Sequence, residues 1–163
     1  PNGICTTYVH NYLKEGDEVT INGPYGEFFL RDTERDIVCI AGGSGMAPIK
    51  SILLNMAEKG NMRKVTYFFG ARTQQDLFLV EEMRELEKKL PNFKFIPALS
   101  NPEEGSSWDG ETGLITEVVA RHITTSDKIE AYLCGSPGMI DACVKVLTEK
   151  GVPKELIYFD KFA

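Results

Sequence analysis

The chain has 163 residues, 42% of them hydrophobic, which is enough for one domain with a sizeable core. Its formal net charge of -6 and the mixing of its Lys and Arg residues with acids argue against a nucleic-acid-binding surface. Cys39 lies inside an apolar, strand-like run, where a buried free thiol is the usual interpretation, so we expect a reduced, intracellular protein. No apolar run approaches the ~20 residues that span a bilayer, and no signal peptide is evident.

The first 35 residues differ in pattern from the rest of the chain. Residues 18–30 suggest two short strands around the turn at Gly23-Pro24. A lone hairpin of this kind is marginally stable in water. We therefore expect it either to pack on the remaining domain or to belong to a β domain that lies mostly outside this sequence.

From Asp36 onward, apolar strands alternate with amphipathic helices. The expected elements are strand 37–41, helix 46–58, strand 65–69, helix 80–90, strand 93–99, helix 114–121, strand 129–133, helix 138–150 and strand 156–159. A loop rich in Gly, Ser and acids runs from residue 100 to 112. Strands that are apolar on both faces predict an α/β fold with a doubly wound, parallel, five-stranded sheet. The expected strand order is 3-2-1-4-5, with right-handed crossovers.

The turn between the first strand and the first helix reads Gly42-Gly43-Ser44-Gly45-Met46-Ala47-Pro48. Glycines here let the backbone approach a pyrophosphate, whose charge is favoured by the free N–H groups of a helix N-terminus. Many strand–helix turns use glycine for steric reasons alone, which is the alternative. Pro48 suits a first helical turn and stands where the dinucleotide fingerprint has its third glycine. The context favours phosphate binding by a variant of that fingerprint.

A second turn follows the fourth strand and reads Cys134-Gly135-Ser136-Pro137-Gly138-Met139-Ile140. Two such turns on neighbouring central strands would flank the crevice in which ligands bind to doubly wound sheets. Cys134 is either a packed thiol or a group at the mouth of this crevice. Neither His10 nor His122 is placed as its base, so a Cys–His hydrolase gains little support. The four cysteines form no C-x-x-C pair, so no metal ligand set is expected within the chain.

The chain ends Tyr158-Phe159-Asp160-Lys161-Phe162-Ala163. An aromatic side chain here either plugs the core or covers a flat ring system by offset stacking. Together with the turns at 43–48 and 134–139, Phe162 resembles the pattern of the ferredoxin–NADP reductase superfamily. Within it, the chain is most similar to the C-terminal part of the F subunits of sodium-translocating NADH:quinone reductases. Phenol hydroxylase and methane monooxygenase reductases are near relatives, and the resemblance covers essentially the whole chain.

The resemblance also accounts for the N-terminal region. It implies that residues 1–35 are the C-terminal remnant of an FAD-binding β-barrel domain and that 36–163 form the NAD-binding domain. Gly3, Cys5 and Thr6 match the family's G-x-x-[ST] segment, which holds the flavin diphosphate at a helix N-terminus. The family's R-x-Y-[ST] flavin motif and its [2Fe–2S] ligands are absent from the sequence. FAD would therefore bind the full-length protein and bind this chain weakly or not at all, while an iron–sulfur cluster would lie outside it.

The resemblance further implies how NADH would bind. The implied contacts are Gly43, Ser44, Gly45, Met46, Ala71, Arg72, Asp76, Cys134, Gly135, Ser136 and Met139. Cys134 would shape the nicotinamide site, and nicotinamide would displace Phe162 from the flavin face, so these two are the implied catalytic residues. Hydride would pass from nicotinamide C4 to flavin N5, and single electrons would then leave for an iron–sulfur centre or a quinone-linked chain. The protein would act by positioning and electrostatics.

Residues 70–76, after the second strand, should meet the adenosine end of the nucleotide. A site for a 2′-phosphate normally supplies Arg or Lys here or after the third strand. Arg72 is the nearby cation, whereas the loop at 100–112 carries acids and neither Lys nor Arg. The sequence therefore predicts NADH over NADPH.

Three functions stay open at this point. The first is the NADH-binding part of a quinone-reductase-like flavoenzyme, working with a flavin barrel, an iron–sulfur domain and, as an option, membrane subunits. The second is the reductase of an aromatic or alkane monooxygenase, or a hydrogenase-linked diaphorase. The third is a stand-alone NAD(H)-binding module without flavin. All three place the domain in the cytoplasm, and membrane partners could hold it at the inner face of the cytoplasmic membrane.

Overall fold

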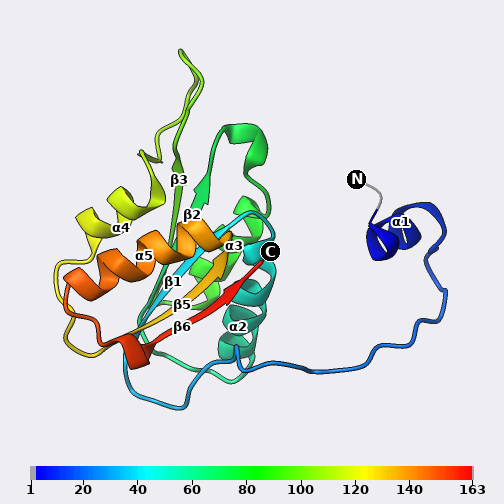
Figure 1. Ribbon diagram of the computed structural model, residues 1–163, viewed down its shortest axis with the longest axis horizontal. Helices are drawn as coiled ribbons and strands as arrows, with labels where there is room; N and C mark the ends of the chain where they lie inside the picture. Colours follow the sequence, from blue (N-terminus) through cyan, green and yellow to red (C-terminus); the bar gives the residue numbers. More distant parts are fainter. Residues whose placement is uncertain (1–2, 163) are drawn as a thin grey trace.

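The structure of the protein, a computed structural model, describes residues 3–162. One parallel sheet, with strand order β4-β3-β2-β1-β5-β6, forms its centre (Figure 1). The strands are β1 (Asp36–Gly42), β2 (Val65–Ala71), β3 (Phe93–Leu99), β4 (Glu111–Thr112), β5 (Ile129–Gly135) and β6 (Ile157–Lys161). The helices are α1 (Ile4–Asn11), α2 (Met46–Glu58), α3 (Val80–Lys89), α4 (Ile115–His122) and α5 (Pro137–Glu149). Short 3₁₀ turns are η1 (Gly43–Gly45), η2 (Gln74–Asp76) and η3 (Lys154–Leu156).

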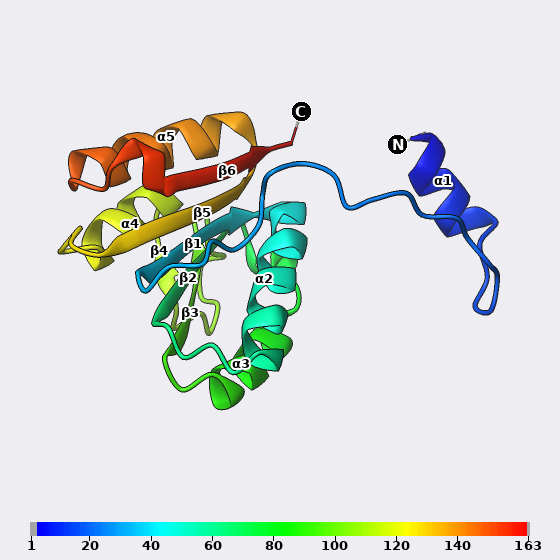
Figure 2. The same ribbon diagram turned by 90° about the horizontal axis from the view of Figure 1, so that it is seen from below.

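Helices cover both faces of the sheet (Figure 2). Alternate side chains of β1 enter two separate cores: Cys39 packs with α2 and α3, whereas Ile40 packs with α4 and α5. Because successive side chains of a strand point to opposite faces, a strand buried on both sides reads as a continuous apolar run. This is why β1 was recognisable in the sequence.

The doubly wound parallel sheet and the order of its five main strands are confirmed. The sheet has one strand more than expected, because β4 lies within the predicted loop and pairs with Ala98 and Leu99 of β3. Two residues are too short a segment to show a strand period. The side chain of Trp108 holds β4 from outside the sheet, with its indole N–H donating to the carbonyl of Glu111 over 3.0 Å.

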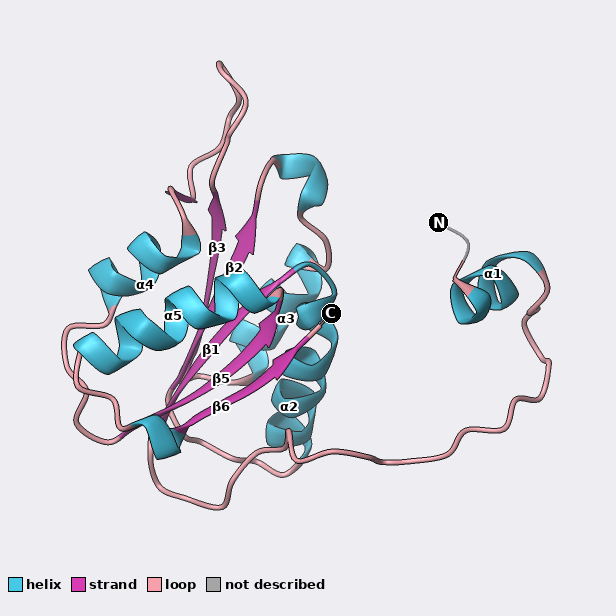
Figure 3. Cartoon of the chain, in the orientation of Figure 1, coloured by secondary structure: helices cyan, strands magenta, loops and turns pink. Residues whose placement is uncertain are grey.

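The predicted N-terminal hairpin is wrong, since residues 12–35 contain no strand. Ile21 and Tyr25, which the hairpin would have carried, are 84% and 85% exposed. An isolated hairpin needs further strands or a helix against its apolar face, and none of the described residues covers these side chains. Helix α1 stands apart from the sheet and buries no residue (Figure 3). Between residues 3 and 162, no helix combines the length and apolarity that a membrane crossing requires.

Candidate functional site

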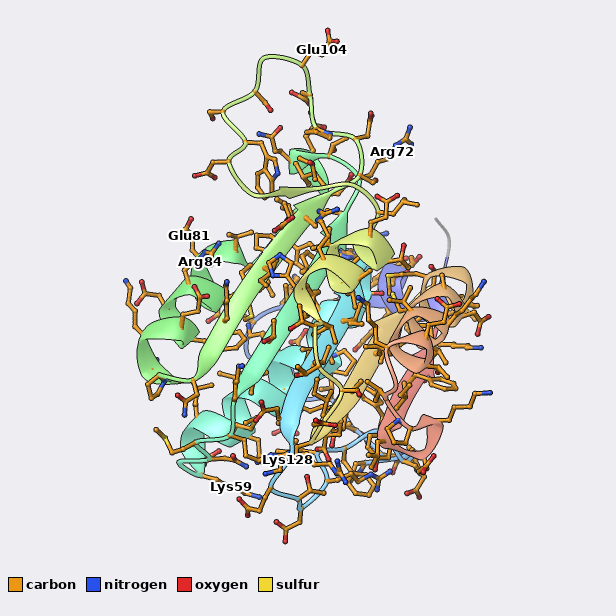
Figure 4. The ribbon with its side chains drawn as sticks, turned by 90° about the vertical axis from the view of Figure 1, so that its left-hand side faces the viewer. Lys59, Arg72, Glu81, Arg84, Glu104 and Lys128 are labelled. Atoms are coloured by element: carbon orange, nitrogen blue, oxygen red, sulfur yellow. The ribbon has the colours of Figure 1, made fainter. Side chains whose placement is uncertain are left out.

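A cavity of 610 Å³ lies where the central strands end. Its lining residues are Gly42, Gly43, Ser44, Gly70, Ala71, Arg72, Asp76, Ser100, Leu114, Ile115, Gly135, Ser136, Met139 and Phe162. Arg72 and Glu104 mark this end of the molecule, and Lys59 and Lys128 mark the opposite end (Figure 4). The cavity thus occupies the crevice at the carboxyl ends of the strands, where doubly wound folds bind ligands.

The first glycine turn forms one wall of the cavity, and its glycines serve two different purposes. Gly43 has φ +54, a left-handed conformation, and a Cβ there would meet no atom within 4 Å. Gly45 has an ordinary helical φ, but a Cβ there would come 2.1 Å from the carbonyl oxygen of Cys134. Gly43 therefore turns the chain beside open space, while Gly45 lets the turn pack directly on β5.

The second glycine turn faces the first across the side chain of Met139. A Cβ on Gly42 would meet the Met139 sulfur at 3.0 Å, and one on Gly135 would meet its Cε at 2.7 Å. Met139 therefore fills the space between the two turns and closes that side of the cavity. Ser136 precedes α5, which begins with a proline, so the free N–H groups of this helix start at the cavity as well.

Cys134 is fully buried and does not line the cavity. Its side chain belongs to the core beneath α2, and this burial, with a smaller contribution from Asp160, raises the pKa of its thiol to about 11. A neutral thiol at physiological pH is a poor nucleophile. Gly45 and Met46 also lie behind the lining, where the Tyr67 hydroxyl donates to the Met46 sulfur over 3.2 Å. Of the residues expected around the nucleotide, these three contribute packing instead of cavity surface.

The expected adenosine-end residues Ala71, Arg72 and Asp76 all line the cavity. The Asp76 carboxylate caps η2, where one oxygen accepts from the Thr73 backbone N–H at 2.9 Å and from its hydroxyl at 3.0 Å. These bonds, the backbone one first, lower the pKa of Asp76. Asp76 is therefore already ordered before any ligand arrives.

Sequence reasoning missed several cavity residues, among them Ser100, Leu114 and Ile115. Ser100 follows β3, and its N–H donates to the Ala71 carbonyl at 3.0 Å, which brings it beside the expected site. A Cβ on Gly70 would meet that of Ile115 at 3.0 Å, so α4 approaches β2 closely at this point. The strand order predicts that the end of the third strand borders the second, and that signal could have found Ser100.

Phe162 lies at the mouth of the cavity, beyond the end of β6. Its backbone N–H donates to the Gly135 carbonyl at 2.9 Å, and the residue is 36% exposed. The expected flavin contacts Gly3, Cys5 and Thr6 lie at the start of α1, away from the sheet (Figure 1). The structure therefore brings most of the expected nucleotide residues together with Phe162 but does not bring Phe162 together with the expected flavin segment.

Comparison with known proteins agrees with this geometry. Residues 39–145 match the family model described as the oxidoreductase NAD-binding domain. The reductase component of propane 2-monooxygenase from Mycolicibacterium goodii is 43% identical, over 99% of this chain and 48% of that protein. The F subunit of the Na⁺-translocating NADH-quinone reductase from Methylococcus capsulatus is 40% identical, over 99% of this chain and 41% of that protein. The chain thus spans about half the length of these curated relatives.

A solved structure shares the fold as well. The FAD/NAD-binding domain of a nitric oxide dioxygenase from Vibrio cholerae superposes with a TM-score of 0.86 at 28% identity, covering 98% of this chain and 65% of that one. The resemblance to the ferredoxin reductase superfamily is therefore confirmed. The chain belongs to the oxidoreductase NAD-binding domain family.

Proposed function

We propose that this chain is the NADH-binding half of a flavin-dependent electron-transfer reductase. The observation that carries the proposal is the cavity with a glycine turn on each side and Phe162 at its mouth. In it, the pyrophosphate would meet the N–H groups near Gly43 and Ser44, and the nicotinamide would lie toward Gly135. Phe162 would leave its position when the nicotinamide ring enters.

The charge at the adenosine end favours NADH. Among the described cavity residues, Arg72 and Asp76 carry the formal charges, so a single cation faces this end. The neighbouring loop holds Glu103, Glu104 and Asp109, whose carboxylates oppose a 2′-phosphate. The fixed Asp76 carboxylate leaves a second oxygen free, which is suited to accept from ribose hydroxyls.

Residues 1–35 would belong to the flavin-binding domain, and 36–163 to the NAD-binding domain. The start of α1 fits a phosphate, since Gly3 accepts the Thr6 hydroxyl at 3.1 Å and a Cβ on Gly3 would crowd that hydroxyl at 2.8 Å. The first N–H groups of the helix remain free of intrahelical partners. FAD, when bound, would supply two-electron acceptance from nicotinamide and one-electron release to a partner. The chain's own part is to orient the nicotinamide, with the packed Cys134 thiol supporting the floor beneath it.

The electron acceptor would be a redox partner protein or domain, such as an iron–sulfur domain. A quinone-reductase-like role and a monooxygenase-reductase role are both supported, because the two named relatives are 40% and 43% identical over nearly the whole chain. Use of NADH would place the domain in the cytoplasm, where membrane subunits could hold it at the inner face of the membrane. A hydrogenase-linked diaphorase would use the same site with a different acceptor.

The test is a titration of the purified chain with NADH and with NADPH, measured by isothermal titration calorimetry. We expect NADH to bind and NADPH to bind at least tenfold more weakly. Replacing Gly43 by Val, which places a branched side chain beside the cavity, should abolish binding, whereas Gly60→Ala, at a turn after α2, should leave it intact. A chain that binds neither nucleotide, or that binds NADPH tenfold more tightly, would refute the proposal.

A further inference from the structure

Residues 27–35, called the strap from here on, connect the N-terminal arm to β1. Figure 2 shows the strap running along the sheet on the same side as α2. Phe28 and Leu30 pack against the core on that side. Beneath the strap lies Glu130, which is fully buried. It is the one charged residue among the buried residues that the structure describes. A buried carboxylate in a strand of apolar residues requires a specific explanation.

Glu130 is fully satisfied by partners that converge on the strap. One carboxylate oxygen accepts from the Arg63 guanidinium at 2.6 Å and from the Tyr132 hydroxyl at 2.8 Å. The other accepts from the hydroxyl of Thr33, within the strap, at 2.7 Å. The Tyr132 oxygen in turn accepts from the backbone N–H of Arg31 at 2.8 Å. Glu130 thus holds the strap both directly and through Tyr132.

The side chain of Arg63 binds the backbone of the strap. Its Nε donates to the carbonyl of Arg35 at 2.6 Å and its Nη1 to the carbonyl of Arg31 at 3.1 Å, while Nη2 reaches Glu130. Three nitrogens of one planar guanidinium therefore fix three acceptors in one geometry, which the single ammonium of a lysine cannot reproduce. The side chains of Arg63 and Glu130 are 8% and 0% exposed, so water competes little for these bonds.

Aromatic contacts hold the other end of the strap. Phe28 meets Tyr132 edge to face with ring centroids 6.1 Å apart, and Tyr132 stacks on Tyr158 at 5.2 Å. The Arg31 guanidinium lies 3.8 Å from the Phe29 ring centroid and 4.8 Å from that of Tyr158. The strap is therefore attached to β5 and β6, the strands that lead to Gly135 and Phe162.

A buried ion pair adds little net stability compared with apolar side chains of the same volume, but the bonds of this one join the strap to β5 in a single arrangement. We propose that Glu130, acting through Arg63 and Tyr132, is a positioning residue: it fixes the strap, the junction between the NAD-binding domain and the flavin-binding domain that would precede it, and thereby how that domain is held at the nicotinamide end of the cavity. The inference rests on the proposed function. Hydride transfer is sensitive to such placement, because an error of about 1 Å between reacting groups can cost 10²-fold in rate.

The first test uses this chain alone and needs no flavin. Trypsin cleaves after Arg31 and Arg35, whose carbonyls are the two acceptors of Arg63, and after Lys14 in the exposed arm. In the wild type, cleavage at Lys14 should precede cleavage in the strap. Glu130→Gln should speed cleavage after Arg31 by about tenfold or more, because local opening becomes more frequent.

Two further variants make this test specific. Thr33→Val removes the bond to Glu130 from the strap side, together with the one that the Thr33 hydroxyl accepts from the Arg35 N–H at 3.2 Å, and should also speed cleavage after Arg31. Glu85→Gln makes the same chemical change as Glu130→Gln in an exposed ion pair of α3, and should cleave as the wild type does. A wild-type strap that is cut as fast as Lys14, or variants that are cut no faster than the control, would overturn the proposal.

The second test measures flavin reduction in the full-length flavoprotein by stopped flow. Thr33→Val and Glu130→Gln should lower the rate of hydride transfer by about tenfold or more, with NADH affinity and flavin content unchanged. Lower melting temperatures with an unchanged rate per bound flavin would show a purely structural role and overturn the proposal. Failure of the proposed function would look different, since NADH would then leave even the wild-type flavin oxidised while the proteolysis result still stood.

Discussion

Gly43 and Gly45 of the first turn should respond differently to alanine. Gly45→Ala places a Cβ 2.1 Å from the Cys134 carbonyl oxygen and 2.5 Å from its carbon, both backbone atoms of a central strand. Reaching the 3.0 Å lower bound of real Cβ contacts requires a shift of about 0.9 Å. Overpacking in a well-packed core costs about 1–3 kcal/mol, and a rigid backbone neighbour places this case near 3 kcal/mol. Gly43→Ala meets no atom and should cost about 1 kcal/mol through its left-handed φ.

Urea unfolding followed by circular dichroism measures both values, and titration with NADH measures the site. Gly45→Ala should unfold at a distinctly lower urea concentration with an unchanged m-value. Gly43→Ala should stay nearly as stable but lose NADH affinity, because the added methyl group occupies space beside the cavity. Equal stability of Gly45→Ala and the wild type would refute the close approach of the turn to β5. Unchanged NADH affinity of Gly43→Ala would show that the pyrophosphate does not bind at this turn.

Phe162→Ala in the full-length reductase should tighten nicotinamide binding severalfold in a titration and slow flavin reduction, by removing a competitor for the stacking position. Arg72→Ala should change NADH affinity by less than tenfold, because NADH has no 2′-phosphate to pair with this cation. The unfolding free energy should fall as pH rises from 9 toward 11, since burial raises the pKa of Cys134 to about 11, and those of Cys39 and Cys143 further, while an unfolded thiol ionises first. Cys134→Ala should make that fall less steep, with Cys39 and Cys143 keeping the remainder; an unchanged slope would contradict the burial argument.

The sheet was predictable because the residues of each main strand indicate whether its faces are buried. Residues 37–41 are apolar throughout, and the structure buries both faces of β1. Helix α2 repeats Ile49, Leu53 and Met56 at helical spacing, and these side chains are buried. The strand order then follows from general rules of connection instead of from any residue.

Other features depend on partners that a local pattern does not reveal. Glu130 lies within an apolar strand, and nothing near it in sequence shows that Arg63 and Thr33 will meet it. The hairpin prediction failed for the same reason. Residues 18–30 suggest two strands around a turn, but a stable hairpin also needs other strands or a helix against its apolar face. Cys134 was placed in the turn after the fourth strand, but it lies within β5 and its side chain faces the core and not the cavity. A one-residue change of register reverses the face that a side chain occupies, so proximity along a strand does not establish exposure.

The proposed nucleotide site combines these two cases. Its walls include Gly42, Gly43 and Gly135, which fit there because they have no side chain. Such positions are recognisable in the sequence as turns. Among the described lining residues, charge is confined to Arg72 and Asp76, and Asp76 already caps η2. A site with so few ionisable groups is suited to orienting a ligand and not to acid–base chemistry. In the proposed reductase, the rate of hydride transfer would therefore depend on how the nicotinamide and flavin rings are held, and the strap with its buried ion pair would matter to turnover as much as the cavity does.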